Sequence, residues 1–269
     1  MISEVRLKTL LIVGLSLLFN LSQASDLEKE KRWANQVVDS ILVGEAQWLN
    51  AGKVKFLSIY TENTSPKSLG GAIILHGTGV HPNWDQVIRP LRTQLPEFGW
   101  TTLSLQLPIL SNEAGYQDYI PLFSEVAPRI KAGVDFLKAK GIHNIVIIAH
   151  SLGSTMAAYY LGNKPDPAIS AFVAIGASGN FYKSNKVDFL SSLKTIKVPV
   201  LDLFGSDDLN SVLKSEKAKA AVARKAGNKN YTQVKIAGAN HFFDDKNAVL
   251  VKRVRGWLLK NAAGTEIKK

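Results

Sequence analysis

The sequence predicts an α/β protein in which a mostly parallel sheet carries helices on both of its faces. Apolar runs of strand length recur along the chain with little alternation of polar residues, which is typical of strands buried on both faces. Stretches with helical periodicity separate these runs, as in folds built from strand–helix–strand units. The chain has 269 residues, of which 46% are hydrophobic, and this is enough for one large core.

The first elements alternate between helix and strand. Residues 26–42 carry charged and apolar residues at helical spacing, which predicts a helix. Residues 53–63 alternate as a strand does, and residues 71–79 form a buried strand that ends in a glycine-bracketed loop. Helical periodicity over residues 84–97 and a strand over residues 100–108 follow.

The second half of the chain repeats this alternation after a polar loop. The predicted helices are residues 120–140, 154–161, 211–226 and 246–260, and the predicted strands are residues 144–148, 171–178, 198–205 and 231–238. The sequence has no internal repeat and no long linker, so we expect residues 25–269 to form a single domain. The connection after residue 178 is only about 20 residues long, which leaves room for little or no cap domain.

The first residues have the pattern of a secretory signal peptide. Arg6 and Lys8 form a basic start, and residues 10–21 are an apolar run too short to span a membrane. Small residues then occupy the positions that a leader peptidase recognises before Ser25. We expect residues 1–24 to be removed and the mature protein to be periplasmic or secreted, with an uncleaved anchor as the alternative.

Composition excludes several classes of chemistry. The chain has no cysteine, so it has no disulfide, thiolate metal site or cysteine nucleophile. Its histidines and carboxylates show no metal-binding spacing, and we expect neither a metal nor another cofactor.

The formal net charge of +11 is concentrated towards the end of the chain. The residues of this basic face are Lys214, Lys217, Lys219, Arg224, Lys225, Lys229 and Lys235, followed by Lys252, Arg253 and Arg255. Such a face can attract an anionic envelope surface, although we favour a solvated face that keeps the protein soluble. No nucleic-acid motif accompanies the charge.

Polar residues follow four of the predicted strands, where an open parallel sheet binds its ligands. These loops are HGTG at residues 76–79, HSLG at 150–153, GSDD at 205–208 and GANH at 238–241. In the second loop, Ser151 lies between a predicted buried strand and a predicted helix that follows it almost directly, without a longer loop. Ser151 is therefore either the N-cap of the helix or a nucleophile held in a sharp turn.

Together these loops resemble the α/β-hydrolase superfamily. Its small-x-Ser-x-Gly elbow corresponds to AHSLG at residues 149–153, with Ala149 where superfamily members usually have glycine. The superfamily order of serine, acid and histidine is matched by Ser151, Asp208 and His241. The resemblance extends over residues 53–260. The stretches LHGTGVHPNW, QLP and AHSLGS are similar to an uncharacterised group of exported bacterial proteins with this fold.

The resemblance implies a role for each of these residues. His241 would take the proton of Ser151 and return it to the leaving group, while Asp208 would fix the imidazole tautomer. The backbone N–H groups of Leu152 and Thr78 would form the oxyanion hole.

Some assignments stay open among neighbouring residues. The spacing of the superfamily selects Asp208, with Asp207 as the alternative acid and the mid-strand Asp202 as a weaker candidate. His76 and His150 are expected to orient loops.

Apolar residues near the predicted nucleophile suggest the substrate class. The candidates for the substrate pocket are Trp84, Met156, Phe181 and Phe242, which would suit a small or medium acyl group. The sequence therefore predicts a serine hydrolase that cleaves carboxylic esters through an acyl-enzyme, with thioesters and amides as alternatives. The rival hypothesis is a non-catalytic envelope protein that binds anionic glycans or lipid head groups.

Overall fold

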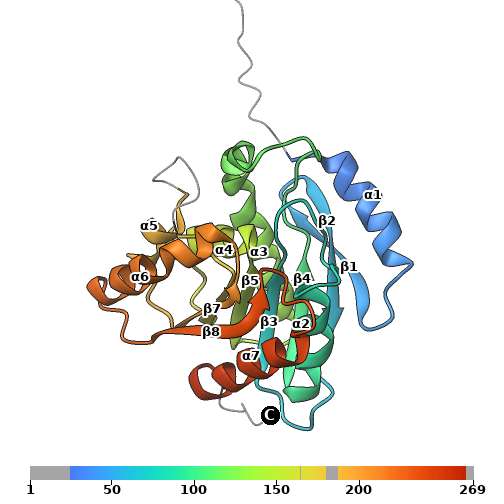
Figure 1. Cartoon of the computed structure of the whole chain (residues 1–269). Coiled ribbons are helices and arrows are strands. Elements are labelled where there is room, and N and C mark those ends of the chain that lie inside the picture. Colours follow the sequence, from blue (N-terminus) through green and yellow to red (C-terminus); the bar gives the residue numbers. More distant parts are fainter. Residues whose placement is uncertain (1–24, 164, 180–186, 265–269) are drawn as a thin grey trace, which may run out of the picture.

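The computed structural model describes residues 25–163, 165–179 and 187–264, so the predicted signal peptide lies outside the described residues. Within these residues eight strands form one sheet in the order β1-β2-β4-β3-β5-β6-β7-β8 (Figure 1). The strands are β1 Glu45–Ala51, β2 Val54–Thr61, β3 Gly70–Leu75, β4 Trp100–Leu105, β5 Ile145–His150, β6 Ile169–Ile175, β7 Val200–Asp207 and β8 Tyr231–Asn240. Strand β2 pairs antiparallel with both β1 and β4, and all the other pairs are parallel.

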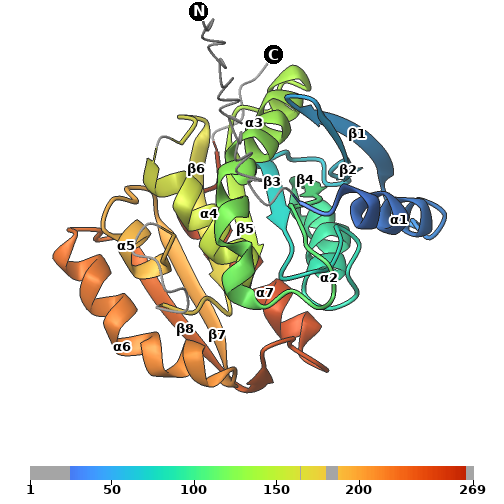
Figure 2. The ribbon, with the colours of Figure 1, turned by 90° about the horizontal axis from the view of Figure 1, so that it is seen from above.

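Helices cover both faces of this sheet. They are α1 Leu27–Val38, α2 Ile88–Gln94, α3 Phe123–Ala139, α4 Leu152–Asn163, α5 Phe189–Leu193, α6 Asn210–Lys225 and α7 Asn247–Asn261, with 3-10 turns η1 Leu95–Phe98 and η2 Tyr116–Leu122. Helices α2 and α7 lie on one face, and α3, α4, α5 and α6 lie on the other (Figures 1 and 2). Helix α1 lies at the β1–β2 end of the sheet (Figure 2).

Successive side chains of each central strand enter two different cores. In β3, Ile73 and Leu75 pack with residues of α3 and α4, whereas Ala72 and Ile74 pack with residues of α2 and α7. Because both faces are buried, these strands carry continuous apolar runs in the sequence. The predicted fold class, a mostly parallel sheet with helices on both faces, is confirmed.

The structure contains two elements that the sequence analysis did not predict, strand β1 and helix α5. Strand β1 was not predicted, because it is a partly exposed edge strand whose polar residues hide its pairing with β2. Between β6 and β7 the structure describes residues 176–179 and 187–199, which add only the five-residue helix α5. None of the described helices has the length and apolar character that crossing a membrane requires.

Candidate active site

Ser151 lies at a sharp turn between β5 and α4. Its φ of 55° is in the left-handed region, which residues other than glycine seldom adopt without a structural reason. The turn is held because the Ser151 N–H donates to the carbonyl of Ile175 in β6, at 2.9 Å. A Cβ at Gly153 would be 2.3 Å from the carbonyl oxygen of His76, so this position requires glycine. The serine hydroxyl is therefore presented at the carboxyl end of the sheet.

Two loops at the same end of the sheet bring Asp208 and His241 to this hydroxyl. Nε2 of His241 is 3.0 Å from Oγ of Ser151, and Nδ1 of His241 is 2.6 Å from Oδ1 of Asp208. A carboxylate only accepts hydrogen bonds, so Nδ1 carries the proton and Nε2 is free to accept one from the serine. The three residues form a continuous hydrogen-bonded chain.

The surroundings of Asp208 keep its carboxyl group ionised. Burial alone would raise the pKa of Asp208, but its hydrogen bond with His241 and those from the backbone N–H groups of Leu209 and Gly205 outweigh burial and lower the pKa. The alternative acid, Asp207, is exposed and accepts a hydrogen bond from Ser206. Asp208 is thus the carboxylate that contacts the imidazole.

The loop after β3 lies directly against the serine. A Cβ at Gly77 would be 3.3 Å from Cβ of Ser151, so glycine allows this loop a close approach. Thr78 and Leu152, the two expected contributors of oxyanion N–H groups, both line the cavity beside Ser151. The hydroxyl of Thr78 is buried and has no hydrogen-bond partner among the described residues.

His76 holds the loop after β3 in place through hydrogen bonds of its ring. Its Nε2 accepts a hydrogen bond from the N–H of Leu107 at 2.9 Å, which leaves Nδ1 to donate to the carbonyl of Gly77 at 2.8 Å. The ring is fully buried, and burial lowers the pKa of His76 to about 3. A neutral His76 therefore joins the loop after β3 to the loop after β4.

His150 performs a similar task for the histidine loop. Its Nε2 donates to the backbone carbonyl of His241 at 2.9 Å, and the two rings are 4.8 Å apart. Burial, together with the proximity of His241, lowers the pKa of His150 to about 3. His150 thus links the elbow to the segment that presents His241.

These two neutral histidines predict early loss of stability in acid. Because their folded pKa values lie below the value of about 6.5 expected in the unfolded chain, only the unfolded chain gains protons as the pH falls below 6.5. Their stabilising effect is complete above that pH, and at pH 5 each histidine should have cost about 2 kcal/mol of unfolding free energy. Urea unfolding at pH 7.5, 6 and 5 measures this loss.

A matched pair of variants assigns that loss to the buried rings. His76→Gln should reduce the pH dependence, whereas His143→Gln should leave it unchanged because His143 is exposed. An unfolding free energy that stays constant between pH 7 and pH 5 in the native protein would contradict the prediction.

A cavity of about 370 Å³ opens beside Ser151 and His241. Its lining includes the apolar residues Leu152 and Leu209, the aromatic residue Tyr116, and four residues that carry hydroxyl groups, Thr78, Thr155, Ser178 and Ser211. Among the described residues, no lysine, arginine, aspartate or glutamate lines it. Its size suits a small organic ligand, and its lining suits an uncharged one.

The comparisons with known proteins agree with this architecture. A family model described as protein of unknown function (DUF3530) matches residues 23–119 and 122–260. The chain belongs to this family. No curated protein matches its sequence significantly.

Solved structures show the same fold at low sequence identity. Est1E from Butyrivibrio proteoclasticus has a TM-score of 0.65 and 18% identity over 82% of this chain and 100% of that chain. A dienelactone hydrolase from Anabaena variabilis has a TM-score of 0.59 and 18% identity over 81% of this chain and 98% of its own. XC6422 from Xanthomonas campestris, described as an α/β serine hydrolase without lid, has a TM-score of 0.63 and 14% identity over 84% and 98%. This DUF3530 chain therefore has the α/β-hydrolase fold.

The apolar residues proposed for the substrate pocket lie elsewhere. Met156 is fully buried in the core that α3 and α4 form with the sheet, and it is not among the residues that line the cavity. Trp84 packs in an aromatic cluster with Trp33 and His81. Both assignments are therefore corrected.

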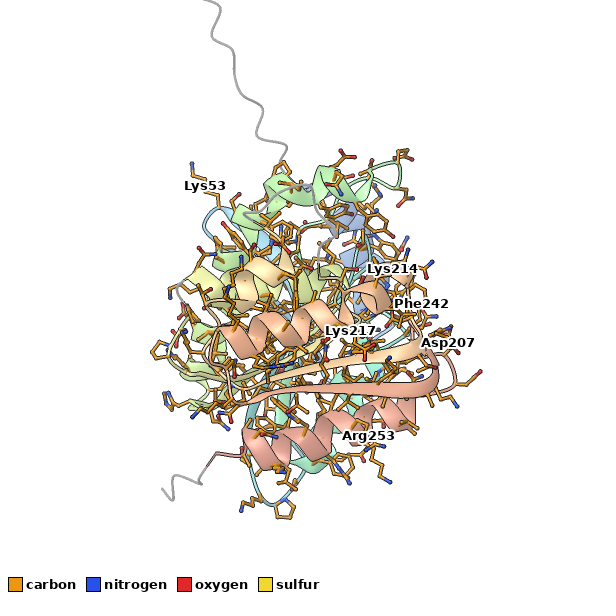
Figure 3. All side chains as sticks on the ribbon, turned by 60° about the vertical axis from the view of Figure 1, so that its left-hand side comes forward. Lys53, Asp207, Lys214, Lys217, Phe242 and Arg253 are labelled. Atoms are coloured by element: carbon orange, nitrogen blue, oxygen red, sulfur yellow. The ribbon has the colours of Figure 1, made fainter. Side chains whose placement is uncertain are left out.

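The other two pocket candidates have different outcomes. Phe242, labelled in Figure 3, is 42% exposed. Its ring packs edge-on against the His241 ring, just after the end of β8. It borders His241 rather than lining the cavity. Phe181 lies outside the described residues. The lining residues that the sequence analysis missed, Tyr116 and Leu209 among them, carry no motif, although Leu209 directly follows the triad acid candidate Asp208.

Asp202, the weaker candidate for the acid, belongs to a buried ion pair. Its Oδ1 lies 2.9 Å from Nζ of Lys219, and both side chains are fully buried. Tyr231 and Gln233 donate further hydrogen bonds to Asp202. Lys219 also donates to the carbonyl of Ala177, which adjoins the cavity wall. Lys219 is therefore not part of the surface charge to which the sequence analysis assigned it.

The remaining basic face extends around the edge of the sheet. Figure 3 shows Lys214 and Lys217 on α6 and Arg253 on α7, with β7 and β8 between the two helices. Lys235 on β8 is paired with Glu216, at 2.5 Å. Binding of an anionic envelope surface by this face stays a prediction.

Proposed function

We propose that this protein is a serine hydrolase that cleaves carboxylic esters of small or medium acyl groups. One observation carries the proposal: Ser151, held at a strained turn, is hydrogen-bonded to His241, which is hydrogen-bonded in turn to the ionised Asp208. A lone serine hydroxyl is a weak nucleophile, and an oriented base is what activates it. The position of the three groups in loops at the carboxyl ends of β5, β7 and β8 supports the proposal, because ligands bind at this end of open parallel sheets.

The proposed mechanism uses only groups of this chain and water. Nε2 of His241 takes the Ser151 proton while Oγ bonds to the ester carbonyl carbon, and Nδ1 remains bound to Asp208. The N–H groups of Leu152 and Thr78 would hold the negative oxygen, and the N-terminus of α4 adds its favourable dipole. His241 then gives the proton to the departing alkoxide, and water cleaves the acyl-enzyme by the same steps.

The lining of the cavity supports an uncharged acyl group. Leu152 and Leu209 offer apolar contact, and no lysine, arginine, aspartate or glutamate is present among the described lining residues. A charged substrate would lose hydration there without gaining a partner. The binding protein proposed as a rival would not need a base aligned on a serine.

A substrate screen tests this proposal. The purified protein should hydrolyse nitrophenyl esters of two to eight carbons faster than the matched thioesters and amides. Failure to hydrolyse any of the three classes, together with salt-sensitive binding to anionic vesicles, would favour the non-catalytic alternative.

Leu209 gives a sharper test of the acyl site. The side chain borders the cavity while its backbone N–H donates to Asp208, so Leu209→Ala removes apolar contact and keeps that hydrogen bond. We expect KM for a hexanoate ester to rise about fivefold, equivalent to roughly 1 kcal/mol of lost burial, with acetate hydrolysis almost unchanged. Steady-state kinetics with both esters measures the difference.

The matched control is Leu259→Ala, which truncates an exposed leucine of α7. It should alter neither KM. An equal effect of Leu209→Ala on acetate and hexanoate would show that Leu209 does not contact the acyl chain.

A further inference from the structure

The segment that begins at Ser25 contacts a partly buried carboxylate on α3. The Ser25 backbone N–H donates to Oε1 of Glu125 at 3.1 Å, and the Ser25 hydroxyl donates to Oε2 of the same carboxylate at 2.8 Å. Ser25 is only 7% exposed. The backbone nitrogen of a residue at the start of a predicted mature chain is thus held at a carboxylate.

The charges around this nitrogen are unbalanced. Arg129, fully buried, binds Glu30 through two hydrogen bonds of 2.7 and 3.0 Å. The nearest approach of Arg129 to Glu125 is 3.9 Å, so two carboxylates share one guanidinium. Lys29 supplies no second cation, because its Nζ binds the carbonyl of Leu110 and the side chain of Asn112. Glu30, Glu125 and Arg129 together therefore carry two negative charges and one positive charge.

A free amino group at Ser25 would supply that charge. The α-amino group of a chain has a pKa of about 7.7–8.0 and is mostly cationic at pH 7. Its nitrogen would be the atom that already lies 3.1 Å from Glu125. A charge-assisted hydrogen bond would then replace the one made by an uncharged amide.

We propose that hydrolysis of the Ala24–Ser25 bond creates an α-ammonium group that binds Glu125 and balances the charge of this partly buried cluster. A leader-removing peptidase would add water across the peptide bond, leaving a carboxylate on Ala24 and the amine on Ser25. Because Glu30 belongs to α1 and Glu125 and Arg129 belong to α3, the new charge strengthens the attachment of α1 to α3. The proposal is independent of the hydrolase activity.

Two measurements on the exported chain test the proposal. The full sequence, expressed in a Gram-negative bacterium and recovered from outside the cytoplasm, should yield an N-terminus at Ser25 by N-terminal sequencing and intact mass. The mature protein should also melt roughly 3 °C above a form with one extra glycine before Ser25, because the glycine moves the charge away from Glu125.

Charge variants separate the ion pair from a steric effect of the added glycine. In Glu125→Gln the difference between the two forms should disappear. It should persist in Asp135→Asn, which removes a half-exposed carboxylate from the same helix. Cleavage at another bond, equal melting temperatures of the two native forms, or a difference that survives Glu125→Gln would each overturn the proposal.

Discussion

Replacement of Ser151 by alanine is expected to lower kcat for ester hydrolysis about 10⁵-fold. The substitution removes the oxygen that attacks the carbonyl carbon, and leaves His241 and Asp208 hydrogen-bonded to each other. The residual rate acceleration of the variant would come from the oxyanion N–H groups and from substrate binding alone. Initial-rate measurements with a short nitrophenyl ester, made on protein that elutes as the native form does, give the ratio.

Ser40→Ala is the matched control for this variant. Ser40 is exposed at the end of α1, where its hydroxyl donates only to the carbonyl of Val37. The control should retain full turnover. If Ser151→Ala kept more than about one hundredth of native turnover, an enzyme contaminant or another nucleophile would have to be responsible.

Replacement of Lys219 by methionine is expected to cost about 3–5 kcal/mol of unfolding free energy. Lys219 and Asp202 are both fully buried, so removal of the ammonium leaves an uncompensated carboxylate in the interior. The loss of the bond to the Ala177 carbonyl should also loosen the cavity wall. Urea unfolding measures the change in stability.

Two further variants distinguish a buried pair from a surface one. Lys131→Met breaks the exposed pair with Asp135 and should change stability by less than about 0.5 kcal/mol. The double substitution Lys219→Met with Asp202→Asn should be less destabilising than the sum of the two single changes, since the stranded charge is gone. Strict additivity would contradict the account of this pair.

The fold follows from the sequence where burial is complete. In β3 and β5 both faces of the strand are covered, and the apolar run is itself the signal. In β1 only one residue is buried, so pairing with β2 could be seen only in three dimensions. The short helix α5 escaped notice because five residues are too few to show a helical period.

The candidate site divides in the same way. Ser151, Asp208 and His241 each follow a strand, and strand ends in a parallel sheet are close together, so their order along the chain indicated their proximity. The cavity lining depends instead on the direction of single side chains. Thr155 and its neighbour Met156 point to different sides of α4, and the larger apolar residue is the one in the core.

The buried ion pair of Lys219 and Asp202 could not be predicted from the sequence either. Lys219 occurs in a run of exposed basic residues, and only the sheet shows that Asp202 lies opposite it. The sequence analysis therefore counted one positive charge too many on the basic face, that of Lys219.

The most direct test of the central claim is covalent labelling with a serine-reactive fluorophosphonate, followed by mass spectrometry of the digested protein. The account predicts one adduct, on Ser151, formed in the native protein and absent from Ser151→Ala. It also predicts a much slower reaction in His241→Ala, because the base that activates the hydroxyl is missing. A native protein that forms no adduct, or a Ser151→Ala variant labelled as fast as the native one, would contradict the claim that Ser151 is an activated nucleophile.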